Sequence, residues 1–216
     1  KGVYELGSVF KTFTLAAALD ENLIEVDTKF IDLEKSINCG NNTIREYDQK
    51  IPKDLTAEEI LIRSGNIGSV RIGQKIGVEK FKDFLTKINV INKIEFDVDE
   101  IGIPISFKWG KCKLATTSFG HGITTTPLQL AKGYAIVTNG GFDVNPTIIK
   151  EKSEKLIKYK KRIIKENVSK KINPILRKIV TSKEGTANLA DVKGYEIGGK
   201  TGTAEKIVSG TYSNQK

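Results

Sequence analysis

The chain has 216 residues, 38% of them hydrophobic and 28% charged, which suits one ordinary globular domain with a buried core. Its formal net charge is +9, but lysine supplies most of it and only five residues are arginine, the side chain favoured in phosphate and base recognition, so the composition does not indicate a nucleic-acid partner. No apolar run approaches the roughly 18 residues that a transmembrane helix needs, and the N-terminus lacks the pattern of a signal peptide.

Helical patterns dominate the N-terminal part of the sequence. Residues 8–24 are good helix formers and are apolar on most sides, which is typical of a buried helix. Residues 27–53 are polar and contain Asn38-Cys39-Gly40-Asn41-Asn42, so we expect surface loops and short strands there. Thr56 and Glu59 have the spacing of a capping box and therefore predict the start of a second helix.

The second helix is interrupted at Ser64-Gly65-Asn66, and helical periodicity resumes from Ile67 to Ile88. The triplet is therefore expected in a tight link between two helices. Thr126-Pro127 supplies an N-cap and a first-turn proline for a further helix, which Gly140-Gly141 ends.

The C-terminal part has strand-like patterns. Residues 150–171 alternate roughly between lysine and apolar side chains, and we interpret them as a solvated face of strands or a hairpin, with an anionic partner as the alternative. Residues 195–208 alternate like a strand with three glycines, and Ser209-Gly210 predicts a hairpin turn whose return strand the chain does not complete. The predicted class is therefore α+β, one domain over 1–216 that is incomplete at both edges.

The sequence restricts the catalytic groups. His121 is the only histidine, so any Ser-His-Asp or Cys-His mechanism would depend on it alone. It lies in Phe119-Gly120-His121-Gly122, which predicts a bend, and we interpret it as structural or surface-exposed, with a place near the substrate as the alternative. Histidine and carboxylate residues lack metal-ligand spacing, and Cys39 and Cys112 match no metal or redox pair. A disulfide between these cysteines is compatible with the sequence but not required by it.

A serine nucleophile without histidine needs another base, and Ser8-Val9-Phe10-Lys11 supplies one. Residues three apart share a helix face, so the Ser8 hydroxyl and the Lys11 amine are expected side by side at the start of the first helix. The helix amides stabilise developing negative charge there, and the apolar neighbours of Lys11 favour its neutral form, which can accept a proton. The motif alone is weak, because Ser213-Asn214-Gln215-Lys216 matches it by chance.

The triplet Ser64-Gly65-Asn66 supplies a second set of polar groups. The Ser64 hydroxyl can relay a proton, and the Asn66 amide can hold a substrate carbonyl. Ser36-Ile37-Asn38 fits the same Ser-x-Asn pattern, so the distinguishing feature of the triplet is its position between two predicted helices.

Lys200-Thr201-Gly202 occurs once, on the predicted glycine-rich strand, where a peptide can add alongside by backbone hydrogen bonds. Lys200 would supply positive charge, and the hydroxyls of Thr201 and Thr203 would bind a terminal carboxylate. Gly202 belongs to the same substrate-binding segment, and a backbone amide near Thr203 would form half of an oxyanion hole.

Ser-x-x-Lys, Ser-x-Asn and Lys-Thr-Gly in this order are the motif set of serine β-lactamases and penicillin-binding proteins. Nearly the whole chain resembles the class B penicillin-binding proteins, and among them the cell-division (septal) transpeptidases. The segments that carry the resemblance are Tyr4-Glu5-Leu6-Gly7-Ser8-Val9-Phe10-Lys11, Arg63-Ser64-Gly65-Asn66-Ile67-Gly68, Ser118-Phe119-Gly120-His121-Gly122, Thr126-Pro127-Leu128-Gln129-Leu130-Ala131, Asn139-Gly140-Gly141, Glu184-Gly185-Thr186-Ala187 and Gly198-Gly199-Lys200-Thr201-Gly202-Thr203-Ala204. Leu6 stands where the family usually has proline and Gly65 where serine is common, and neither change removes a reacting atom. Asn66 favours the septal over the elongation branch.

The resemblance implies a penicillin-binding-protein transpeptidase fold, with a helical core against an antiparallel sheet and no cofactor or metal. Ser8 would attack the D-Ala-D-Ala bond of a peptidoglycan stem peptide and pass the acyl group to an amine of a neighbouring stem, and β-lactams would acylate the same serine. The expected partners are peptidoglycan stem peptides, β-lactam antibiotics and divisome membrane proteins including a glycosyltransferase, at the periplasmic face of the bacterial inner membrane. The family's flanking sheet strands and N-terminal membrane anchor are expected outside this segment, so we expect the isolated segment to be poorly stable or inactive.

Three other functional classes are alternatives to the transpeptidase interpretation. A class A β-lactamase of the same fold needs Glu-x-x-Leu-Asn to activate the deacylating water, and the nearest string, Glu184-Gly185-Thr186-Ala187-Asn188, lacks the leucine. A β-lactam-sensing domain keeps the same motifs, so the sequence discriminates against it poorly. A nucleic-acid binder is disfavoured because arginine and aromatic residues are not clustered.

Overall fold

The computed structural model describes residues 2–40, 42–150, 161–203, 206–208 and 211–213. Its helices are η1 (Gly7–Phe10), α1 (Lys11–Asp20), α2 (Ala57–Ile62), α3 (Asn66–Ile76), α4 (Val78–Lys87), α5 (Lys111–Thr117), α6 (Pro127–Thr138), α8 (Glu166–Thr181) and η2 (Asn188–Ala190). Its strands are β1 (Tyr4–Glu5), β2 (Lys29–Phe30), β3 (Ser36–Cys39), β4 (Asn42–Arg45), β5 (Leu55–Thr56), β6 (Thr124–Thr125), β7 (Lys206–Val208) and β8 (Thr211–Ser213). No helix in the described part of the chain is long and apolar enough to cross a bilayer.

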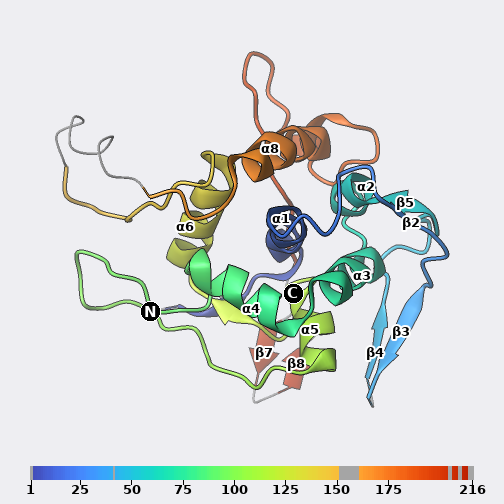
Figure 1. Cartoon of the computed structure of the whole chain (residues 1–216), viewed down its shortest axis with the longest axis horizontal. Coiled ribbons are helices and arrows are strands. Elements are labelled where there is room, and N and C mark those ends of the chain that lie inside the picture. The colour runs from blue at the N-terminus through green and yellow to red at the C-terminus, as the bar shows by residue number, and fades with distance from the viewer. Residues whose placement is uncertain (1, 41, 151–160, 204–205, 209–210, 214–216) are drawn as a thin grey trace.

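Helix α1 is the centre of the fold. Figure 1 shows it surrounded by α2, α3, α4, α6 and α8, all of which contact it. Every residue of α1 is buried, as its apolar sequence predicts, and the rings of Phe10 and Phe13 pack edge to face with their centroids 5.3 Å apart. Truncating such core side chains typically costs about 3–5 kcal/mol, so packing of α1 strongly stabilises the support for the motif at its start.

The strands pair antiparallel, β1 with β6, β2 with β5, β3 with β4 and β7 with β8, as four two-stranded sheets within the described residues. The combination of helices with short antiparallel sheets confirms the predicted α+β class. The capping box predicted at Thr56 forms, since its hydroxyl accepts from the Glu59 amide at 3.3 Å. Thr126 is the N-cap that the sequence predicts, and its hydroxyl accepts from the Gln129 amide at 3.1 Å in a capping box that the sequence analysis does not predict. The first α-helix, however, ends at Asp20, four residues before the predicted end.

Two predictions for the last predicted strand are wrong. Residues 195–203 form no strand, and strand structure begins only at β7. The pairing of β7 with β8 is a return strand that the sequence does not predict. The predicted turn at Ser209-Gly210 lies outside the described residues.

The prediction of strands or a hairpin over 150–171 is wrong for most of these residues that the structure describes, and only Arg162 forms an isolated antiparallel bridge, with Phe142. Residues 166–171 begin α8, and 151–160 lie outside the described part. Helix α8 buries Val168, Ile172 and Ile175, whose spacing is helical, and it packs on α1, α2 and α6. The apolar pattern therefore becomes helical only when it is followed beyond Lys171.

Cys39 and Cys112, whose pairing the sequence leaves open, form a disulfide across 73 positions of the sequence, with their Cα atoms 5.4 Å apart. Cys39 ends β3 and Cys112 is the second residue of α5. The bond therefore ties the β3–β4 hairpin to α5.

Candidate active site

Ser8 lies in the turn between β1 and α1, and close contacts hold this turn. The amide of Gly7 donates to the carbonyl of Gly120 at 3.2 Å, and a Cβ at Gly120 would lie 1.9 Å from the Gly7 oxygen. Only glycine permits this approach. The hydroxyl of Tyr134 donates to the carbonyl of Val9 at 2.7 Å. Ser8 is thus presented from a backbone that is fixed before and after it.

Ser64-Gly65-Asn66 links α2 to α3, as the sequence predicts. Ser64 has φ +58°, a left-handed conformation that is uncommon for serine. Nζ of Lys11 donates to Ser64 O at 2.5 Å, to Ser64 Oγ at 3.2 Å and to Asn66 Oδ1 at 2.7 Å. Nδ2 of Asn66 donates to the carbonyl of Arg45 at 2.9 Å, which determines that the amide oxygen faces Lys11.

Lys200 also forms a hydrogen bond with the Ser64 hydroxyl. Its Nζ donates to Ser64 Oγ at 2.8 Å and to Thr201 O at 3.0 Å. Ser64 Oγ therefore receives N–H groups from both lysines, which occupies its lone pairs and leaves its own O–H available as a donor. A Cβ at Gly202 would lie 2.7 Å from Val9 Cγ1, so glycine lets this segment pack against the turn that carries Ser8.

Burial changes the acid–base character of both lysines. Lys11 is 1% exposed. Burial, and then the neighbouring Lys200 ammonium, hold the pKa of Lys11 well below its ordinary value of 10.5, while the Glu46 carboxylate acts in the opposite direction. Burial lowers the pKa of Lys200 to about 8. A neutral Lys11 amine has a lone pair, so it can act as a base.

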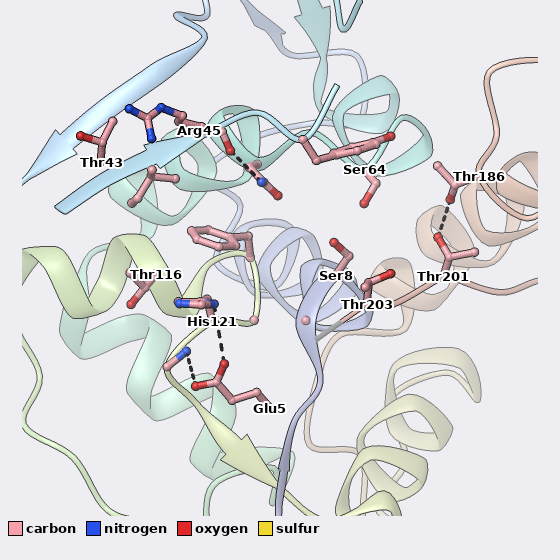
Figure 2. A pocket seen from close by; sticks show the side chains of 17 residues that line it. Glu5, Ser8, Thr43, Arg45, Ser64, Thr116, His121, Thr186, Thr201 and Thr203 are labelled. Atoms are coloured by element: carbon pink, nitrogen blue, oxygen red, sulfur yellow. Dashed lines mark hydrogen bonds and ion pairs between the residues drawn. The ribbon is translucent and has the colours of Figure 1, made fainter. Parts of the chain in front are cut away.

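These groups surround one cleft with a volume of about 970 Å³. Its lining residues are Glu5, Gly7, Ser8, Thr43, Ile44, Arg45, Tyr47, Ser64, Asn66, Thr116, Phe119, Gly120, His121, Gly122, Thr186, Thr201 and Thr203. Figure 2 shows the hydroxyls of Ser8 and Ser64 directed toward one another across it. The hydroxyl of Thr201 lies 2.7 Å from that of Thr186.

The structure thus brings the residues singled out from the sequence to one place. Ser8, Ser64, Asn66, Thr201 and Thr203 line the cleft, while the two lysines reach Ser64 from beneath it by hydrogen bonds and the motif glycine packs on the nucleophile turn. Among the described residues, Ser8 Oγ has no hydrogen-bond partner. The chance matches lie elsewhere: Ser36 to Asn38 belong to β3 and do not line the cleft, and residues 214–216 lie outside the described part.

His121 lies at the cleft rather than on a remote surface. Its Nδ1 is 3.6 Å from the carboxylate of Glu5, which also accepts from the amide of Gly122 at 2.9 Å. Nζ of Lys113 donates to the carbonyl of Gly122 and lies 4.0 Å from the centroid of the Phe107 ring. These contacts hold the turn that faces Ser8, so His121 both supports this turn and lines the cleft.

Sequence reasoning missed Glu46 and Thr186 as site residues. Glu46 is 6% exposed and accepts from the amides of Asn66 and Ile67, both at 2.8 Å. No local pattern indicates this contact, because its partners lie 20 and 21 positions later in the sequence. Thr186 belongs to Glu184-Gly185-Thr186-Ala187, a segment that carries the family resemblance, and this was its only signal.

Known proteins with similar sequences and structures agree with this geometry. The model of the family described as penicillin binding protein transpeptidase domain matches residues 1–216. The probable peptidoglycan D,D-transpeptidase FtsI of Caulobacter vibrioides is 32% identical over 206 residues, and stage V sporulation protein D of Bacillus subtilis is 34% identical over 221 residues. These alignments cover 94% and 97% of this chain and 34% of each relative, so the chain spans about a third of their length. The transpeptidase domain of Burkholderia pseudomallei penicillin-binding protein 3 matches with a TM-score of 0.89 at 25% identity, over 99% of this chain and 64% of that one.

Three motifs around one cleft in an α+β fold define the class that serine β-lactamases and penicillin-binding proteins share. Within that class, the family match over the whole chain decides between the branches. The chain belongs to the penicillin-binding protein transpeptidase domain family, which confirms the resemblance seen in its motifs.

Proposed function

We propose that the protein is a serine-type peptidoglycan D,D-transpeptidase that acts through an acyl-enzyme on Ser8. The observation that carries the proposal is the convergence of the buried Lys11 and the partly buried Lys200 on the Ser64 hydroxyl in the cleft that Ser8 lines. The name of the Caulobacter relative, a probable peptidoglycan D,D-transpeptidase, supports the same reaction.

Acylation begins with attack of Ser8 Oγ on the carbonyl carbon of the penultimate D-alanine. The ammonium form of Lys11 has three N–H bonds for its three acceptors, whereas the neutral amine has two and a lone pair that takes the Ser8 proton. Backbone amides of Ser8 and Thr203 bind the oxyanion. The C–N bond then breaks, the leaving amine takes the proton of Ser64 Oγ, and the Lys11 ammonium restores that proton.

The C-terminal carboxylate of the stem peptide binds at the Lys200-Thr201-Gly202 motif. Lys200 supplies the positive charge, and the hydroxyls of Thr186, Thr201 and Thr203 supply hydrogen bonds. For transfer, the amine of a second stem peptide attacks the ester carbon, loses a proton to Lys11, and Ser8 Oγ leaves with that proton. Every protein group in these steps belongs to this chain, so the proposed reaction requires no cofactor or metal.

The disulfide supports an oxidising location such as the periplasm, because disulfides persist there and are rare in the cytosol. The septal type of motif supports a role in cell-division wall synthesis, with anchoring at the bacterial inner membrane. The partners of such a protein are peptidoglycan strands, β-lactams, and divisome membrane proteins including a glycosyltransferase.

Among the residues that the structure describes, the carboxylates do not supply the water activation that the β-lactamase alternative needs at the cleft. Glu184, in the string compared with the class A pattern in the sequence analysis, is 44% exposed at its side chain, lies 4.0 Å from Arg63 and does not line the cleft. Glu5, which lines it, is engaged by His121 and Gly122. The geometry therefore favours a long-lived acyl-enzyme over rapid hydrolysis.

The test supplies a stem pentapeptide ending in D-Ala-D-Ala, with an acceptor stem, to the protein that carries this chain. Mass spectrometry is expected to detect free D-alanine and a cross-linked dimer, both absent in Ser8→Ala. Rapid turnover of a chromogenic cephalosporin without dimer formation would assign a β-lactamase instead. Dimer formation by Ser8→Ala would refute the proposed nucleophile.

A further inference from the structure

We propose that Glu46 is a positioning residue of the acyl-transfer site, a buried carboxylate that holds the start of α3 and so directs the Asn66 amide at Lys11. The inference rests on the proposed function, because it assigns Glu46 to the acylation of Ser8. Glu46 belongs to none of the three motifs and lies directly after β4.

The contacts of Glu46 are those of a carboxylate that replaces a missing helix cap. The N-cap of α3 is Gly65, which has no side chain to accept the free amides. Glu46 Oε2 accepts from the amide of Asn66 and Oε1 from that of Ile67, each at 2.8 Å. Such charge-assisted hydrogen bonds at a helix N-terminus are stronger than neutral ones.

The adjacent residue fixes the other side of Asn66. The Arg45 carbonyl accepts from Asn66 Nδ2 at 2.9 Å, so residues 45 and 46 hold the side-chain amide and the main chain together. The remaining amide atom, Asn66 Oδ1, then accepts from Lys11 at 2.7 Å. If the Asn66 side-chain amide were turned by about 180°, its NH2 group would face the N–H groups of Lys11, and two hydrogen-bond donors would oppose each other.

Backbone pairing and a disulfide hold the segment that carries Glu46. Its amide donates to the carbonyl of Lys35 at 3.0 Å, which extends the β3–β4 pairing by one contact. The far end of this hairpin is tied to α5 by the disulfide of Cys39 and Cys112. Positional error at Glu46 is therefore small, as a positioning residue requires.

Glu46 also acts on Lys11 through charge. The charged groups that act on Lys11 are the Lys200 ammonium, which lowers its pKa, and the Glu46 carboxylate, which raises it. The remaining partners, Ser64 and Asn66, are neutral. Removing the carboxylate should therefore have two separable effects: a disordered Asn66, and a Lys11 that loses its proton at lower pH.

Glu46→Gln keeps the shape and removes the charge. A glutamine has one carbonyl oxygen, so it can accept from one of the two amides, and its NH2 group opposes the other. Glu46→Asp keeps the charge but shortens the side chain by one methylene. Glu59→Gln is the matched control, because Glu59 is also a carboxylate at a helix start, accepting from the Thr56 amide at 2.8 Å, and has no contact with Lys11 or Asn66.

The measurement is the second-order rate constant for acylation by a fluorescent penicillin as a function of pH, normalised to the protein labelled at saturation so that unfolded molecules do not count. Glu46→Gln is expected to acylate about tenfold more slowly at the optimum, with its acid limb at lower pH than that of the unmodified protein. Glu46→Asp is expected to acylate more slowly than the unmodified protein, with the acid limb of its pH profile at nearly the same pH. Glu59→Gln is expected to match the unmodified protein in rate and limb while melting at lower temperature.

Outcomes against the inference are distinct from outcomes against the proposed function. If the unmodified protein is acylated at Ser8 but Glu46→Gln and Glu46→Asp both acylate within twofold of it with unmoved acid limbs, Glu46 is only a structural cap and the inference fails. If Glu59→Gln slows acylation as much as Glu46→Gln, the effect is general destabilisation and the inference fails equally. If the unmodified protein takes no label on Ser8, the proposed function and the inference fall together.

Discussion

Lys200→Met should make the fold more stable at neutral pH while it disables the site. Burial lowers the pKa of Lys200 from 10.5 to about 8, so the folded chain bears the cost of a partly buried ammonium. At about 1.4 kcal/mol for each pH unit between these values, that cost is about 3 kcal/mol. Methionine fills a similar volume and carries no charge, although it also gives up the hydrogen bonds to Ser64 and Thr201.

The pH dependence separates these two contributions. Below pH 8 both the folded and the unfolded chain hold the Lys200 proton, and the whole cost is present. As the pH rises above 8 the folded chain releases the proton first, so the unfolded chain binds more protons and the stability of the unmodified protein rises relative to the variant until about pH 10.5. The lost hydrogen bonds contribute an offset that changes little with pH.

Urea unfolding at pH 7 and pH 10 measures the difference in the free energy of unfolding between Lys200→Met and the unmodified protein. That difference should be about 2–3 kcal/mol more favourable to the variant at pH 7 than at pH 10. Lys193→Met, at an exposed lysine of the same segment, serves as the control and should change stability by no more than about 0.5 kcal/mol at either pH. A difference for Lys200→Met that is equal at both pH values, or that favours the variant more at pH 10, would refute the argument that burial lowers this pKa.

Three further predictions concern the cleft and the disulfide that holds the β3–β4 hairpin beside it. Gly202→Ala should slow acylation at least about tenfold, because the new Cβ would lie 2.7 Å from a valine methyl of the nucleophile turn. Gly199→Ala is the control and should leave the acylation rate unchanged, because a Cβ there meets nothing within 4 Å. Equal acylation rates for the two variants would contradict this prediction. Acylation by penicillin should decline above about pH 8 as Lys200 loses its charge, and Lys200→Arg should lack this alkaline limb; a limb that survives the exchange would show that another group titrates. Reduction of the Cys39–Cys112 disulfide should lower the free energy of unfolding by about 2–4 kcal/mol, given a closed loop of 73 positions, and a double serine variant that still responds to reductant would disprove the assignment.

The parts of the fold that local chemistry determines could be predicted from the sequence. Thr56 forms the capping box that its spacing to Glu59 indicates, Thr126 caps its helix as expected, and the apolar residues of α1 are buried on all sides. The link at Ser64-Gly65-Asn66 lies between two helices as expected. In each case the determining contacts span only a few residues.

Elements that depend on distant partners were missed. Helix α8 contains Pro174 in its interior, which argues against a helix locally, and it is stabilised by burying its apolar side against α1, α2 and α6. Residues 195–203 alternate like a strand but have no strand beside them to pair with in the described structure. Alternation shows which faces a segment could present, and only a partner decides whether the segment becomes a strand.

The site follows the same division. The three motifs are visible in the sequence because each is short, and their order identified the family. The Glu46 contact to Asn66, the disulfide and the position of His121 beside Glu5 depend on how segments meet in space, so no pattern within any one segment could reveal them.

The central claim, that Ser8 is the acylated nucleophile activated by Lys11, is tested most directly by peptide mapping after labelling with a fluorescent penicillin. The protein that carries this chain should bear one covalent adduct on the peptide containing Ser8, with no adduct in Ser8→Ala and a much slower one in Lys11→Ala. An adduct on another residue, or undiminished labelling of Ser8→Ala, would contradict the account.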